Sequence, residues 1–142
     1  MQNKNVLDEV NKGCSMGMDA ITDVLDKVSD NVFKKVLKGE YNKYNNIHDR
    51  IEKVYNDYSS LEPTETNSVN KAMTSMMINM KTLTDTSNSK IAELLLQGTN
   101  MGIIEGRKLL NHKDELDSEV YKILTDFIEM QEDSVETLKK YL

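Results

Sequence analysis

The feature that most constrains this chain is a helical spacing of apolar residues that returns along most of its 142 residues. Side chains three and four positions apart lie on one side of an α-helix. The only proline, Pro63, stands in the polar stretch 59–66 and marks the clearest break in this pattern. We therefore expect an all-α protein.

Two long helices are expected before the break. The first, over 4–28, has its apolar stripe at Val10, Cys14, Gly17, Ile21, Val24 and Val28. The second, over 31–58, has its stripe at Phe33, Leu37, Tyr44, Ile47, Ile51, Val54 and Tyr58. Ser29 or Asp30 can cap the second helix by accepting from its first free N–H groups. The short turn between the helices predicts an antiparallel pair.

Three helices are expected after the break. A short one follows the stripe from Val69 to Leu83, and long ones cover 89–111 and the stretch from Leu116 to the C-terminus. If each helix packs against its sequence neighbour, the second and third long helices run parallel. We therefore expect one domain over 1–142, a ferritin-like antiparallel four-helix bundle with a short crossover helix between those two. A plain five-helix up-and-down bundle would give the same pattern.

Charge and composition limit the partners. The formal net charge of −6 argues against nucleic acid and against anionic membrane surfaces, because both attract basic proteins. Cys14 is the only cysteine, and neither a leader sequence nor an apolar run approaching ~18 residues is recognisable. We expect a cytoplasmic protein without a membrane or nucleic-acid partner.

The positions that would hold a pair of iron ions carry the wrong residues. A ferritin-like metal site takes Glu-x-x-His pairs from two helices and a carboxylate from each of the others. The second helix has Asn45 and His48 at this spacing, and the last helix has Gln131 and Ser134. Glu40, His48 and Glu105 remain as candidates for a reduced site for one divalent ion, Fe, Mn or Zn. The simpler alternative is that both acids reach solvent and His48 is an ordinary half-buried histidine.

Glycines recur at four-residue steps within two predicted helices, at Gly13, Gly17, Gly98, Gly102 and Gly106. Each costs about 1 kcal/mol relative to alanine in a helix interior, so their alignment indicates close approach by another group. Three uses are open: tight helix packing, a groove that receives tyrosines such as Tyr41 or Tyr44, or a self-association face.

Other motifs for chemistry are weak. Methionines cluster at 73, 76, 77 and 80, with two more at 16 and 18. Thioethers can bind Cu(I), but such a cluster is more often core or an adaptable contact surface. Cys14 has no histidine near it in sequence, and only His48 and His112 exist. Catalysis by side chains alone is not expected.

The stretches 16–21, 91–105 and 136–142 resemble an uncharacterised family of short ferritin-like proteins from clostridia and their relatives. This resemblance implies a ferritin-like bundle in a bacterial cytoplasm, and it implies no activity. Three functions are therefore expected as alternatives: a non-catalytic interaction or scaffold protein that forms a homodimer, a divalent-metal binder, or a small-molecule or peptide binder that uses the glycine-lined groove.

Overall fold

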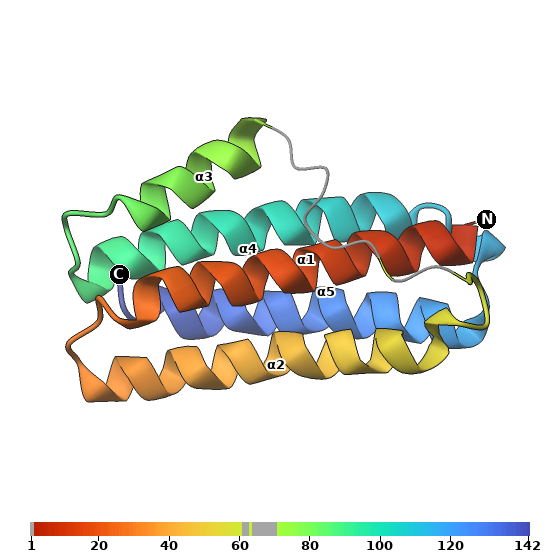
Figure 1. The fold of residues 1–142 in the computed structure, drawn as a ribbon, viewed down its shortest axis with the longest axis horizontal. Helices are drawn as coiled ribbons and strands as arrows, with labels where there is room; N and C mark the ends of the chain where they lie inside the picture. The colour runs from red at the N-terminus through yellow and green to blue at the C-terminus, as the bar shows by residue number, and fades with distance from the viewer. Residues whose placement is uncertain (1, 61–62, 64–70) are drawn as a thin grey trace.

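The computed structural model describes residues 2–60, 63 and 71–142. The regular elements among these residues are all helices, without a strand (Figure 1). The elements are α1 (Gln2–Leu25), α2 (Asn31–Tyr55), α3 (Lys71–Lys81), α4 (Asn88–Leu110), a single 3-10 turn η1 (Lys113–Glu115) and α5 (Ser118–Lys139). The all-α prediction is confirmed.

The predicted limits of the four long helices lie within three residues of the observed ones. The first two helices end earlier than predicted, because their apolar stripes continue into the turns that follow. Val28 is buried although α1 stops at Leu25, and Tyr58 lies beyond the end of α2. The predicted start of the short helix at Val69 and most of the break around Pro63 lie outside the described residues.

The four long helices form a bundle in which neighbours run antiparallel (Figure 1). α1 packs between α2 and α4, and α5 completes the bundle against α2 and α4. α2 and α4 run in the same direction, as do α1 and α5. α3 lies outside this bundle and packs against α1 and α4.

Two helices begin next to a side chain that accepts hydrogen bonds from their free backbone N–H groups. Asp30 accepts from the backbone N–H of Val32 and Phe33, at 2.8 and 3.1 Å, and starts α2. Ser87 accepts from the N–H of Lys90 at 3.2 Å and starts α4. The Asn88 side chain donates to Asp30 at 3.1 Å, which links the two starts at one end of the bundle.

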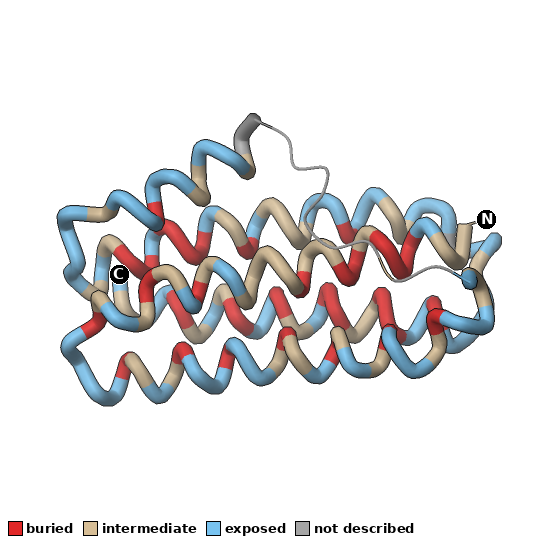
Figure 2. Tube along the Cα trace, in the orientation of Figure 1, coloured by how far each residue is buried: buried red, intermediate tan, exposed pale blue. Residues whose placement is uncertain are grey.

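The core runs along the bundle axis, where the buried positions of the long helices meet (Figure 2). Fully buried residues come from all four, including Leu7 of α1, Phe33 and Ile51 of α2, Ile91 of α4 and Leu124 of α5. Among the described residues, no helix is long and apolar enough to span a bilayer.

Candidate functional site

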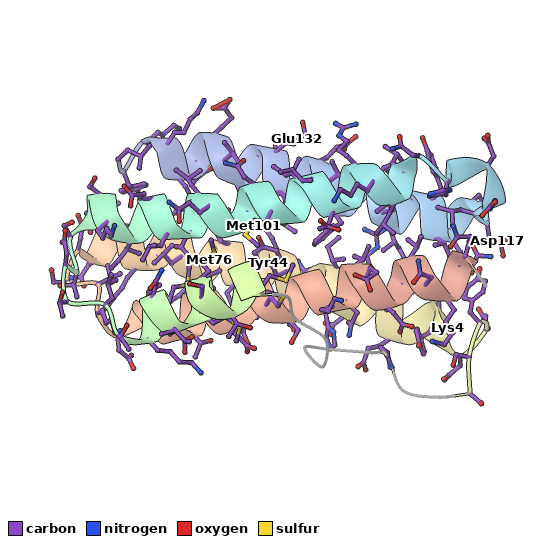
Figure 3. All side chains as sticks on the ribbon, turned by 90° about the horizontal axis from the view of Figure 1, so that it is seen from above. Lys4, Tyr44, Met76, Met101, Asp117 and Glu132 are labelled. Atoms are coloured by element: carbon purple, nitrogen blue, oxygen red, sulfur yellow. The ribbon has the colours of Figure 1, made fainter. Side chains whose placement is uncertain are left out.

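A cavity of about 90 Å³ lies inside the end of the bundle that α3 covers. All five helices line it, and its wall is mostly apolar. Six of the nine methionines of the chain contribute to this wall: Met16, Met73, Met76, Met77, Met80 and Met101. Figure 3 places Met76, Tyr44 and Met101 in the same region of the molecule. We call this space the methionine cavity.

Four of the five glycines that recur at four-residue steps in α1 and α4 make room for side chains of facing helices. A Cβ on Gly17 would lie 2.6 Å from Cζ of Tyr44, and one on Gly13 would lie 2.7 Å from Phe127. On α4, a Cβ on Gly102 would collide with the Gln131 amide. These contacts are closer than real Cβ atoms allow, so glycine is required for the observed packing.

The other two glycines of α4 complete this pattern. Gly106 receives Ile128, and a Cβ on Gly98 would lie 3.2 Å from Sδ of Met76 at the cavity wall. The glycine faces are therefore occupied within the chain. Of the two tyrosines considered for a glycine groove, Tyr44 lies in it, while Tyr41 is exposed.

Polar groups gather at one side of the methionine cavity. Glu40 and Tyr44 are one turn apart on α2 and share a helix face. The Tyr44 hydroxyl forms hydrogen bonds with the side chains of Gln131 and Thr99, and the Glu40 carboxylate acts on it electrostatically. Burial raises the pKa of Tyr44 to about 12, so its phenol is neutral at pH 7. Glu40, Tyr44, Thr99 and Gln131 therefore form one polar cluster, which we call the cavity floor.

Two oxygens of the cavity floor are buried without a hydrogen-bond partner in the described part of the chain, Oε1 of Glu40 and Oε1 of Gln131. Both residues line the cavity and are at most 4% exposed. The second carboxylate oxygen of Glu40 pairs with Nζ of Lys43 at 2.7 Å. Leaving a buried acceptor unpaired costs about 1–3 kcal/mol. The floor thus presents two acceptors that a molecule in the cavity can satisfy.

α3 closes the cavity and is fastened at its C-terminal end. Nζ of Lys27, in the turn after α1, donates to the carbonyl oxygens of Met80 and Lys81 at 2.7 and 2.9 Å. These are among the carbonyls that a helix end leaves without an internal partner. Met80 is 1% exposed, whereas Met76 and Met77 are half-buried. The end of α3 near Lys27 is therefore the anchored end.

The candidate metal ligands Glu40, His48 and Glu105 do not come together. Glu40 and His48 are eight residues apart on α2, about 12 Å along the axis, whereas one ion needs its ligands within ~2–2.6 Å. His48 instead has Nδ1 at 2.6 Å from Oδ1 of Asn11 and Nε2 at 3.3 Å from Glu52. Glu105 is exposed and pairs with Lys108 at 3.3 Å. The described structure therefore does not bring these three side chains into one group.

The cavity floor also does not fit a pair of iron or manganese ions. It offers one carboxylate, that of Glu40, and otherwise amide, hydroxyl and thioether groups. Hard divalent ions prefer several carboxylate oxygens. Among the described residues, no three His, Cys, Asp or Glu side chains form a group able to hold a metal ion.

Sequence reasoning missed the cavity floor as a site. Tyr44, Gln131 and Ser134 were recognised on core-facing stripes, but Gln131 and Ser134 were considered only as poor metal ligands. Polar residues on an otherwise apolar stripe were the available signal. Thr99 was not among the residues of the predicted stripe, although its side chain bonds to Tyr44.

Comparison with known protein families, with curated protein sequences and with solved structures finds no match to this chain.

Proposed function

We propose that this protein is a non-catalytic binding protein for a small, largely apolar molecule, which it holds in the methionine cavity. The observation that carries the proposal is the pair of buried, unpartnered oxygens, Glu40 Oε1 and Gln131 Oε1, at an otherwise apolar cavity. Ligand sites commonly combine an apolar wall with a few polar groups that orient the ligand. A stretch selected only for packing would have apolar residues at these two positions.

The size of the cavity limits the ligand. One water-sized particle needs ~10–15 Å³ of such space, so about 90 Å³ accommodates roughly six to nine non-hydrogen atoms. The methionine wall suits such a ligand because thioether side chains are flexible and adapt their shape to apolar groups. A peptide or a large cofactor would require α3 to move away.

We further propose that the bundle is ferritin-like and that the methionine cavity replaces its metal centre. Two features support the arrangement: α2 and α4 run in the same direction (Figure 1), and a long connection that includes α3 joins them. Gln131 and Ser134, which stand at the spacing of a Glu-x-x-His pair, both line the cavity. A binding space would then occupy the place where related bundles hold ions.

Homodimer formation through the glycine or methionine faces stays a prediction. The described glycines of α1 and α4 receive side chains of the same chain, and the methionines of α3 face the cavity. Light scattering at increasing protein concentration tests it, and a constant monomer mass would contradict it.

Thermal unfolding with four matched probes tests the binding function: n-pentylamine, 1-pentanol, pentanoate and n-hexane. A molecule that binds only the folded state raises the melting temperature. We expect at least one probe to do so. If none of the four stabilises the protein, the proposed function is wrong.

A cavity-filling variant tests whether the probe binds in the methionine cavity. Gly98→Leu directs an isobutyl group toward Met76, and Gly39→Leu adds the same group on α2 where nothing lies within 4 Å of the new Cβ. We expect stabilisation by the probe to disappear in Gly98→Leu and to persist in Gly39→Leu. Gly98→Ala serves as a milder second variant, with reduced stabilisation. Unchanged stabilisation in both Gly98 variants would show that the probe binds elsewhere.

A further inference from the structure

We infer that the ligand of the methionine cavity carries a primary ammonium group, which binds between the carboxylate of Glu40 and the amide oxygen of Gln131. This inference rests on the proposed binding function and specifies the chemical class of the ligand. A short alkyl chain bearing one terminal amine satisfies both the floor and the wall of the cavity.

The unpartnered groups of the cavity floor are acceptors, so a ligand that satisfies them must supply hydrogen-bond donors. Glu40 Oε1 and Gln131 Oε1 are both acceptors, and both lack a donor in the described part of the chain. The donors of the floor have other partners: the hydroxyl of Thr99 donates to the carbonyl of Leu95 at 2.8 Å, Nζ of Lys43 pairs with the other oxygen of Glu40, and the Tyr44 hydroxyl and the Gln131 side chain bond to each other. A ligand that brings only acceptors, such as a carboxylate, would leave both oxygens unpaired.

The presence of two unpartnered acceptors favours an amine ligand over an alcohol. A hydroxyl group donates one hydrogen bond, whereas a primary ammonium donates three. Tyr44 lies near both residues, because its hydroxyl bonds to the side chain of Gln131 and it follows Glu40 by one helical turn. The inferred site places one ammonium nitrogen between the two oxygens, where it donates to both.

The negative charge of Glu40 also favours a ligand with an ammonium group. The Glu40 side chain is 6% exposed, so its carboxylate lies in a region where charge is poorly solvated, and hydrogen bonds to a charged acceptor are about twice as strong as neutral ones. Its partner Lys43 is 43% exposed, so water screens the lysine charge. The inward oxygen of Glu40 is therefore left to attract a cation inside the cavity.

The apolar wall of the cavity determines which kind of ligand body fits beside the ammonium group. Thioethers and the Leu37, Ile21 and Leu95 side chains line the remainder of the cavity. This wall favours an unbranched or lightly branched alkyl body and disfavours a second charge. With roughly six to nine non-hydrogen atoms of room, a four- to eight-carbon monoamine fits.

Calorimetric titration of the full chain at pH 7 with n-pentylamine, 1-pentanol, pentanoate and n-hexane tests the inference. Pentylamine is protonated at this pH, as a lysine side chain is. We expect pentylamine to bind about tenfold tighter than pentanol, since charged hydrogen bonds add this order of affinity. Tighter binding of pentanol, pentanoate or hexane would overturn the ammonium assignment while it leaves the proposed function in place. Absence of binding by all four would overturn both.

A charge-matched pair of variants locates the ammonium. Glu40→Gln removes the buried carboxylate but keeps its shape, and Glu105→Gln removes the same charge from an exposed position that also pairs with a lysine three residues later. We expect Glu40→Gln to abolish the tenfold preference for the amine and Glu105→Gln to preserve it. An equal loss in both variants would mean that the acidic surface attracts the amine, and no loss in either would mean that Glu40 is not its partner.

Discussion

The packing of Tyr44 on Gly17 is tested most simply by adding one methyl group. Gly17→Ala gains about 1 kcal/mol of helix propensity, but its Cβ would lie 2.6–2.8 Å from three atoms of the Tyr44 ring. The ring is 5% exposed and its hydroxyl is bonded to Gln131 and Thr99, so it has little freedom to move. Overpacking costs about 1–3 kcal/mol, and loss of one hydrogen bond adds about 1 kcal/mol. We expect Gly17→Ala to lower the free energy of unfolding by about 1–3 kcal/mol.

Gly39→Ala is the matched control, because it is an exposed glycine inside α2 with no heavy atom within 4 Å of the new Cβ. It should raise the free energy of unfolding by about 0.5–1 kcal/mol. Urea denaturation followed by circular dichroism measures both, and we expect the two variants to differ by about 1.5–4 kcal/mol. Equal stabilisation of both proteins would refute the close contact between Gly17 and Tyr44.

Three further predictions concern α3, the start of α2 and the single thiol. Lys27→Ala removes the two bonds to the carbonyls of Met80 and Lys81, so we expect faster amide hydrogen exchange across 71–81 with little change in the long helices; unchanged exchange in α3 would contradict the anchoring role. The pKa of Asp30 is lowered from 3.8, chiefly by the Phe33 N–H, so the stability that this charge adds is present above that value and is lost as the pH falls through the lowered pKa. The stability difference between wild type and Asp30→Ala should therefore shrink in acid, and a difference independent of pH would contradict a stabilising role of the Asp30 charge. Burial raises the pKa of the Cys14 thiol, so we expect native protein to react with a thiol reagent far more slowly than protein in urea, and equal rates would contradict the buried position.

The helices were predictable because apolar spacing records which side of each segment is buried. Their ends were less predictable, since Val28 is buried in the turn beyond α1 and its stripe gives no sign that the helix has stopped. The cap of the second helix was predicted as Ser29 or Asp30, because both residue types accept hydrogen bonds at a helix start, and the structure shows that Asp30 is the cap.

The candidate site was predictable only in part. Aligned glycines indicated close approach, but spacing within one helix does not say which side chain arrives, so Gly17 pointed to a tyrosine without deciding between Tyr41 and Tyr44. Glu105 falls near the edge of the α4 stripe, where a small rotation of the helix decides between core and solvent, and it is exposed. The neighbourhood of Glu40 and Gln131 depends on the packing of α2 against α5, which no local pattern encodes.

The methionines provide the most direct test of the methionine cavity as a binding site. In protein labelled at the methionine methyl carbons, addition of n-pentylamine should shift the NMR signals of the six cavity methionines and leave Met18 and Met130, which lie outside its wall, unchanged. Shifts confined to Met18 or Met130, or no shift at any methionine, would contradict a ligand site beneath α3.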